Sequence, residues 1–127
     1  MPENPAILIV EDETIIALDI KFKLQQFGYE NVTTVSSGEK AITLAKELCP
    51  CLILMDIKLA GDLDGIEAAE QINAICKPAI IFMSAFSDKS VLDRAQVLEP
   101  LGYLTKAATD DHLLGLVSKV LGPPIQN

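Results

Sequence analysis

Short apolar runs alternate with longer amphipathic segments along the whole chain. Residues 6–10, 52–55 and 79–83 are continuously apolar, and residues 32–35 and 102–105 form shorter, mixed runs. Short runs that are apolar throughout are typical of strands covered on both faces of a parallel sheet. The pattern therefore predicts five strands.

A helical pattern follows each of these runs. The expected helices cover, in chain order, residues 14–27, 38–48, 66–75, 89–98 and 110–121. Gly28, Pro50 and Gly122 mark the ends of three of them, because glycine and proline interrupt helices. Strands that alternate with helices form parallel βαβ units with right-handed crossovers, which place helices on both faces of one sheet. We therefore expect an α/β fold with a single doubly wound, five-stranded parallel sheet.

Apolar spacing predicts which side of two of these helices is buried. In the first helix the main stripe comprises Ile16, Ile20, Leu24 and Phe27, with Ile15, Leu18 and Phe22 beside it. In the second helix we expect Ala41, Ala45 and Leu48 to face the sheet.

Length and composition indicate one domain. The chain has 127 residues, 50% of them hydrophobic and 22% charged, which supports a buried core and excludes a disordered chain. We expect one domain over residues 1–127, with its core at about 6–121 and residues 122–127 as a tail or the start of a linker. No apolar run approaches the ~20 residues of a membrane span, and no export leader is recognisable, so we expect a cytoplasmic protein without membrane contact.

Charge and cysteine content argue against a nucleic-acid-binding protein, a disulfide-bonded protein and a cysteine-ligated metal site. Eighteen acidic and ten basic residues give a net charge of -8, which repels the phosphate backbone of nucleic acids. Cys49, Cys51 and Cys76 follow no disulfide pattern, so we expect reduced thiols. The Cys49-Pro50-Cys51 segment has no second cysteine pair to complete a metal site. The sequence also contains no motif for binding nucleoside triphosphates or dinucleotides.

The residues directly after the expected strands carry the candidate chemistry. Ligands of open parallel sheets bind beyond the carboxyl ends of the strands. At these ends lie Glu11 and Asp12 after the first strand, Asp56 after the third, Ser84 after the fourth and Lys106 after the fifth. Each residue is ordinary alone, since acids cap helices and lysines are commonly solvated. Their expected convergence at one edge of the sheet is a more specific sign of a functional site than any single residue.

This set of residues favours phosphoryl transfer with a metal ion. Three carboxylates at one edge repel one another unless a cation joins them, and carboxylate oxygens open to water suit Mg²⁺. Asp56 is the expected nucleophile, because carboxylates form acyl phosphates. Ser84 can donate a hydrogen bond to a phosphoryl oxygen, and Lys106 can neutralise its charge. Positioning and charge neutralisation do most of the work in such reactions.

The same positions carry a resemblance to a known family. Its motifs are Ile9-Val10-Glu11-Asp12-Glu13, Leu54-Met55-Asp56, Asp64-Gly65, Ser84-Ala85 and Gly102-Tyr103-Leu104-Thr105-Lys106. From about residue 6 to residue 121 the chain resembles the receiver domain of two-component response regulators, and it is similar to single-domain chemotaxis regulators. The resemblance implies a flavodoxin-like fold with the strand order 2-1-3-4-5.

The resemblance implies a phosphoryl acceptor and a metal site. Asp56 would accept a phosphoryl group from the phosphohistidine of a sensor histidine kinase or of a phosphotransfer protein. Asp12, Asp56 and the backbone carbonyl of Lys58 would hold Mg²⁺, with Glu11 acting directly or through water. A domain of this kind is a self-phosphorylating switch in a phosphorelay, not an enzyme that turns over free substrates.

The resemblance also implies a conformational switch. Ser84 and Lys106 would contact the phosphoryl group, and Tyr103 would change rotamer on activation. The output surface would comprise the fourth helix, the fifth strand and the fifth helix. Through this face the domain would control a partner protein or an attached output domain, and a homodimer remains open.

Two alternatives stay open, and the first rests on departures from the family pattern. Ala107 follows Lys106 where receivers usually have a proline, and the loop at 57–65 lacks the usual Met-Pro. A non-proline residue strongly prefers a trans peptide, so the peptide geometry after Lys106 stays open. One alternative is therefore a degenerate receiver that binds partners without phosphorylation. The other is a phosphatase with an aspartate nucleophile, although such enzymes carry a second aspartate where this chain has Lys58.

Overall fold

The computed structural model describes residues 5–84, 89–105 and 109–123, and these residues form five strands and five helices in alternation. The strands are β1 (Ile7–Val10), β2 (Val32–Val35), β3 (Leu52–Asp56), β4 (Ala79–Ser84) and β5 (Gly102–Thr105). The helices are α1 (Thr14–Gln26), α2 (Gly38–Leu48), α3 (Gly65–Asn73), α4 (Lys89–Gln96) and α5 (Asp110–Leu121). The expected elements are confirmed, with ends that shift by at most two residues.

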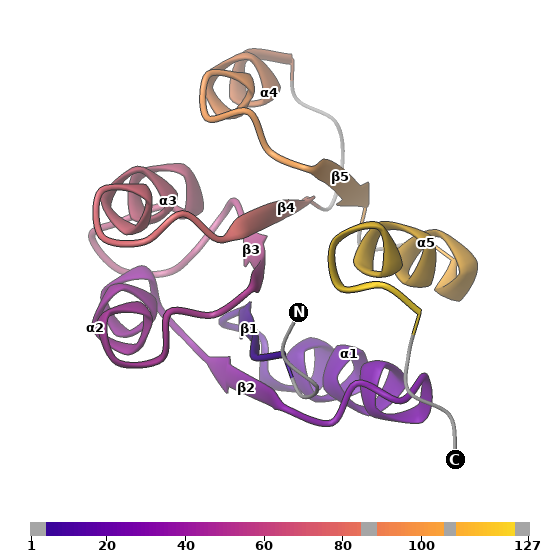
Figure 1. Ribbon diagram of the computed structural model, residues 1–127. Helices are drawn as coiled ribbons and strands as arrows, with labels where there is room; N and C mark the ends of the chain where they lie inside the picture. Colours follow the sequence, from indigo (N-terminus) through magenta and orange to yellow (C-terminus); the bar gives the residue numbers. More distant parts are fainter. Residues whose placement is uncertain (1–4, 85–88, 106–108, 124–127) are drawn as a thin grey trace.

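The strands form one parallel sheet in the order β2-β1-β3-β4-β5. Helices α1 and α5 cover one face of the sheet, and α2, α3 and α4 cover the other (Figure 1). This arrangement confirms the doubly wound, flavodoxin-like fold. All five strands therefore point their carboxyl ends to the same edge, where the candidate residues were expected.

Two apolar layers hold the sheet between its helices. On the side of α1 and α5, buried Ile7 and Ile9 of β1 pack with Leu24 of α1. On the opposite side, buried Leu8 and Val10 of the same strand join the layer under α2, α3 and α4. Successive side chains of a strand point to opposite faces, so a strand with helices on both sides must be apolar throughout. This requirement explains the continuous apolar run at the start of the chain.

Local capping fixes where several helices begin. Ser37 accepts a hydrogen bond from the backbone N–H of Lys40 at the start of α2, and Thr109 accepts one from His112 at the start of α5. Gly28 follows α1 with φ of +103°, a conformation that glycine adopts without strain. Two capping hydroxyls and one glycine thus mark where these helices begin and end.

The structure corrects the burial expected for Leu48 of α2, and it shows three apolar side chains of α1 exposed to solvent. Leu48 is 44% exposed instead of buried, because α2 ends at this residue and the chain turns at Cys49. On α1, the apolar residues beside the main stripe face solvent: Ile15 is 84% exposed, Leu18 53% and Phe22 59%. The main stripe is confirmed, because Leu24 is buried and Ile20 and Phe27 pack against the core; the apolar residues beside the stripe are left exposed.

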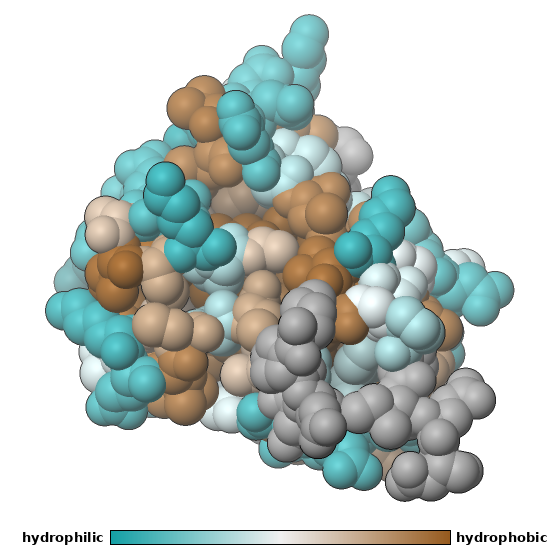
Figure 2. All heavy atoms as spheres, viewed as in Figure 1, coloured by the Kyte–Doolittle hydropathy of each residue, from teal (hydrophilic) through white to brown (hydrophobic). Residues whose placement is uncertain are grey.

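Hydrophilic residues cover the outer parts of the helices, whereas apolar residues gather between them over the middle of the face seen in Figure 2. Among the residues that the structure describes, no helix has the length and hydropathy needed to cross a bilayer.

Candidate functional site

Three carboxylates meet at the carboxyl edge of the sheet. Glu11 and Asp12 directly follow β1, and Asp56 is the last residue of β3. Val10 pairs with Met55 in the parallel register, so the next residues, Glu11 and Asp56, lie at the same level. One oxygen from each of the three side chains lies within 4.8 Å of the other two. The structure thus brings together the acids that the sequence placed at this edge.

Backbone N–H groups orient the carboxylates. Glu11 and Asp56 are each only 1% exposed. Oδ1 of Asp56 accepts a hydrogen bond of 3.2 Å from the N–H of Lys58, and Oε1 of Glu11 accepts one of 3.1 Å from the N–H of Glu13. Asp12 is partly exposed and therefore forms the solvent side of the cluster. The result is a partly buried, oriented set of oxygens with one open side.

The loop between β3 and α3 is tied to this cluster. Oδ2 of Asp12 accepts a hydrogen bond of 3.1 Å from the N–H of Ala60. Farther along the loop, Glu39 of α2 accepts a hydrogen bond of 3.2 Å from the N–H of Leu63. These contacts come from residues distant in sequence, so the loop is held by the tertiary fold.

Gly65 brings the start of α3 against the backbone of Asp56. Its N–H donates a hydrogen bond of 2.8 Å to the carbonyl of Ile57, and a Cβ at this position would overlap the carbonyl oxygen of Asp56. Asp64 caps α3 in a reciprocal capping box with Glu67 and also forms a 3.1 Å ion pair with Arg94 of α4. The sequence marked Asp64-Gly65 only as a family motif, and the structure adds the steric reason for the glycine.

Ser84 lies at the same edge as the acids. It is the last residue of β4 and pairs with Thr105, the last residue of β5, while the preceding Met83 pairs with Asp56. Lys106 and Ala107 follow Thr105 and, like Ala85, lie outside the described residues. The topology therefore agrees with the placement expected for Ser84, and the role of Lys106 stays a prediction.

Lys58 contributes its backbone N–H to Asp56, and its side chain is exposed. The sequence assigned the carbonyl of this residue to the metal, and that assignment stays a prediction.

Tyr103 packs under α4 as a partly buried ring. Its hydroxyl donates a hydrogen bond of 3.4 Å to Oε1 of Gln96, and its ring stacks on Phe82 with centroids 6.3 Å apart and planes at 25°. Burial, followed by the nearby charge of Asp93, raises the pKa of the Tyr103 hydroxyl. The aromatic candidate thus belongs to β5 of the expected output face and contacts both β4 and α4.

The acid cluster fits a hard divalent cation. Its donors are carboxylate oxygens, which are the ligands that Mg²⁺ prefers, and the exposed side of Asp12 leaves room for the waters that Mg²⁺ retains. Three like charges so close together also repel, and a divalent cation offsets that repulsion.

A hollow of about 210 Å³ adjoins the cluster. It is lined by Glu11 with residues from the start of α1 and the end of β2: Thr14, Ala17, Leu18, Thr34, Val35, Ser36 and Lys40. Apolar and polar side chains, among them the exposed Leu18, therefore adjoin Glu11 on the α1 side.

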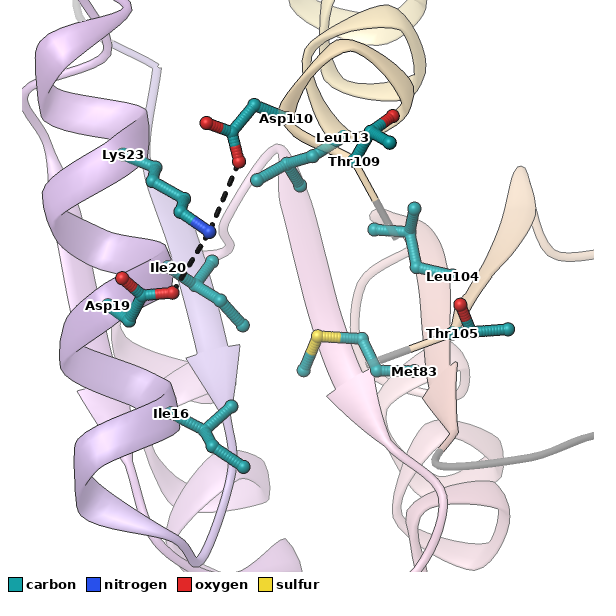
Figure 3. A pocket seen from close by; sticks show the side chains of 10 residues that line it. All are labelled: Ile16, Asp19, Ile20, Lys23, Met83, Leu104, Thr105, Thr109, Asp110 and Leu113. Atoms are coloured by element: carbon teal, nitrogen blue, oxygen red, sulfur yellow. Dashed lines mark ion pairs between the residues drawn. The ribbon is translucent and has the colours of Figure 1, made fainter. Parts of the chain in front are cut away.

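A second cavity, of about 120 Å³, lies between α1 and α5 (Figure 3). Lys23 of α1 crosses its rim and forms ion pairs with Asp19 at 3.0 Å and with Asp110 of α5 at 3.1 Å. Hydrogen bonds to Asp19 and Asp110 raise the pKa of Lys23. The acid cluster does not line this cavity, which instead marks where α1 and α5 are joined.

Comparisons with known proteins agree with the geometry. The sequence profile of the response regulator receiver domain matches residues 7–118. The chain is 36% identical over 108 residues to the transcriptional regulatory protein PdtaR of Mycobacterium tuberculosis, covering 85% of this chain and 52% of that protein. It is 33% identical over 116 residues to the chemotaxis protein CheY of Bacillus subtilis, covering 91% and 96%. The chain therefore spans about half the length of PdtaR and nearly all of CheY.

A solved receiver domain shares the fold and holds a metal ion of its own. The receiver domain of the sensor histidine kinase PA1611 from Pseudomonas aeruginosa PAO1 matches with a TM-score of 0.83 and 28% identity, covering 94% of this chain and 98% of that chain. In that structure a magnesium ion is coordinated in the active-site cleft.

Proposed function

The chain belongs to the response regulator receiver domain family, and from this premise we propose that it is a switch controlled by phosphorylation of Asp56 in a two-component phosphorelay. Such a switch takes its phosphoryl group from a phosphohistidine and passes a conformational change to an output. The observation that supports it most directly is the oriented, almost fully buried carboxylate of Asp56 beside two further acids at the edge of the sheet.

In this proposal Asp56 acts as the nucleophile, and its fixed position supports that role. In the proposed reaction a carboxylate oxygen of Asp56 attacks the phosphorus atom of the phosphohistidine, the P–N bond breaks, and the imidazole nitrogen retains the electron pair. The N–H of Lys58 holds Oδ1 of Asp56 in place, and the Gly65 contact fixes the backbone beneath it. Fixed donors of this kind reduce the entropy that must be lost to reach the reactive geometry.

We assign the metal site to Asp12, Asp56 and the carbonyl of Lys58, with Glu11 binding directly or through water. A bound Mg²⁺ supplies positive charge against the transferring phosphoryl oxygens. Glu11 and Asp12 keep their orientation through the backbone donors at Glu13 and Ala60. The magnesium ion in the cleft of the PA1611 receiver domain supports this assignment.

In this proposal Ser84 and Lys106 contact the phosphoryl oxygens, and Tyr103 responds by changing rotamer. Tyr103 is partly buried and hydrogen-bonded to Gln96 of α4, so a change in its ring would alter the packing of that helix. The output face then comprises α4, β5 and α5. It acts on an attached output domain, a separate protein or a second copy of the chain.

We further propose that the phosphohistidine donor docks on the exposed apolar face of α1. Ile15, Leu18 and Phe22 are more than half exposed, and α1 begins directly after the Glu11–Asp12 pair. Leu18 also lines the hollow that contains Glu11, so this apolar face reaches one acid of the cluster. A donor that covers the apolar face of α1 brings its phosphohistidine to the open side of the acid cluster. We propose that this transfer takes place in the cytoplasm.

The proposal is tested by incubating the protein with Mg²⁺ and a small phosphodonor, such as phosphoramidate, and measuring intact mass. We expect a phosphoryl adduct in the wild type and in the Asp62→Asn control, whose side chain is exposed on the same loop, and none in Asp56→Asn. Absence of the adduct from all proteins would favour a binding module that works without phosphorylation. Sustained turnover of free phosphoesters would favour a phosphatase.

A further inference from the structure

Two cysteines meet at the edge of the sheet opposite the acid cluster. Cys49 lies three residues before β3, which starts at Leu52, and Cys76 lies three residues before β4, which starts at Ala79. Leu52 and Ala79 are paired in the sheet, so the chain brings both cysteines to the amino ends of neighbouring strands. Helices α2 and α3, whose carboxyl ends precede the two cysteines, lie side by side (Figure 1).

The two cysteines share one hydrogen-bond acceptor, the carbonyl of Ala45. The N–H of Cys49 donates to the carbonyl of Ala45 at 2.9 Å, and Sγ of Cys76 lies 3.8 Å from the same oxygen as a donor. The side chain of Cys49 also acts on Cys76, since its charge and hydrogen bonding contribute to raising the pKa of the Cys76 thiol. A disulfide needs its Cβ atoms about 3.5–4.5 Å apart, and the shared contact with Ala45 and the adjoining ends of α2 and α3 favour such an approach.

The two cysteines differ in accessibility. Cys49 is exposed and caps α2 with φ of +43°, a conformation more often taken by glycine. Cys76 is partly buried, and burial followed by the charge of Cys49 raises the pKa of the Cys76 thiol. An oxidant from solvent therefore reacts first with Cys49. The neighbouring Cys76 stays protonated until it reacts in the second step.

We propose that Cys49 and Cys76 form a dithiol site that low-molecular-weight disulfides oxidise to an intramolecular disulfide. The thiolate of Cys49 attacks one sulfur of the small disulfide, whose S–S bond breaks and releases one small thiol. The sulfur of Cys76 then attacks the Cys49 sulfur of the mixed disulfide and releases the second small thiol. The two protein thiols are oxidised, the small disulfide is reduced, and the two protons end on the released thiols.

The new bond would join the end of α2 to the segment after α3. The closed loop, residues 49–76, contains β3, the loop after Asp56 and all of α3. A cross-link across a loop of this length restricts the unfolded chain, and we expect the melting temperature to rise by several degrees on oxidation. This inference does not depend on phosphorylation of Asp56.

The test treats the reduced, folded protein with glutathione disulfide and maps the products by mass spectrometry. Trypsin separates residues 47–58, which carry Cys49 and Cys51, from residues 59–89, which carry Cys76. We expect a cross-link between these peptides in the wild type and in Cys51→Ser. Cys51 is the matched control, because its backbone is fixed at the sheet edge by bonds to Ala6 and Ala79.

The remaining variants isolate the pair. In Cys49→Ser and Cys76→Ser, we expect oxidation to stop at mixed disulfides and the melting temperature to stay unchanged by the oxidant. Circular dichroism of the reduced variants checks that they are folded, and Cys76→Ala replaces any serine variant that is not. A cross-link that persists in Cys49→Ser, a wild type that accumulates only mixed disulfides, or disulfide-linked dimers would each overturn the proposal.

Discussion

Gly65 approaches the backbone of Asp56 so closely that no side chain fits between them. Its Cβ position overlaps the carbonyl oxygen of Asp56 and lies 2.9 Å from Cα of Ile57, while its N–H bonds the carbonyl of Ile57. The first residue of α3 therefore supports the strand end that carries the candidate phosphoryl acceptor.

Replacing Gly65 with alanine should destabilise the fold and disturb the site together. The atoms next to this position belong to the backbone of Asp56 and Ile57, which can move aside only by distorting the strand end. We therefore expect Gly65→Ala to lower the free energy of unfolding by about 2–3 kcal/mol. Urea denaturation measures this change. Gly115→Ala is the control: nothing lies within 4 Å of a Cβ at this α5 position, so alanine should stabilise the helix by about 0.5–1 kcal/mol. Equal effects of the two substitutions would contradict the role of Gly65.

Removing one acid of the cluster should weaken metal binding. We expect Asp12→Asn to reduce affinity for Mg²⁺ by roughly tenfold or more, because the cation loses a charged oxygen ligand. Mg²⁺ titrations followed by NMR measure the affinity, and the metal should also raise the melting temperature of the wild type. Asp62→Asn, at an exposed loop position, should bind as the wild type does. Equal affinity in the Asp12 and Asp62 variants would place the metal elsewhere.

The ion pairs of Lys23 should stabilise the fold only while this lysine is charged. Its pKa is raised above the usual 10.5 by Asp19 and Asp110, so the contribution is complete below about pH 10.5 and is lost as the pH rises through the raised value. The two aspartates are 58% and 57% exposed, which limits the effect to about 0.5–1 kcal/mol.

Denaturation of the wild type and Lys23→Met between pH 7 and about pH 11 tests this dependence. The stability difference should be constant at neutral pH and shrink at the alkaline end. Lys119→Met, at an exposed position of α5, serves as the control. A difference that stays constant to the highest pH would mean that packing of the lysine chain, not its charge, stabilises the α1–α5 contact.

An acidic residue on α1 should slow transfer from a protein donor only. The donor for this test is a sensor histidine kinase that phosphorylates the wild type. We expect Ile15→Asp to reduce the rate of phosphorylation by this kinase about tenfold, because docking loses apolar area and gains a charge. The rate with phosphoramidate should not change. Leu48→Asp, an exposed apolar position at the opposite edge of the sheet, should leave both rates unaltered. Slowing with both donors would instead indicate a disturbed site.

Much of the fold could be predicted because its strands are buried on both faces. The run at Ile7–Val10 must be apolar throughout because both of its faces are covered. Ser37 and Gly28 mark helix ends through local chemistry, so these elements can be predicted without knowledge of tertiary contacts. The acid cluster was predictable for a topological reason, because parallel strands bring Glu11 and Asp56 to one edge wherever the chain runs between them.

Other features depend on contacts that no local pattern encodes. Apolar residues occur on several sides of α1, so the exposure of Ile15 and Phe22 follows from how the helix packs on the sheet. The Arg94–Asp64 ion pair joins residues 30 apart, and neither residue carries a sequence signal for the other. The approach of the Cys76 thiol to the Ala45 carbonyl in α2 likewise appears only when α2 and α3 are placed side by side.

The most direct test of the central claim locates the phosphoryl group on the chain. After reaction with phosphoramidate, borohydride reduction converts an aspartyl phosphate to homoserine, and the tryptic peptide 47–58 contains Asp56 as its only aspartate. We predict homoserine at position 56, formed when Mg²⁺ is present and strongly reduced when it is chelated. Homoserine at another aspartate, or none anywhere in the folded protein with Mg²⁺, would contradict the assignment of Asp56 as the phosphoryl acceptor.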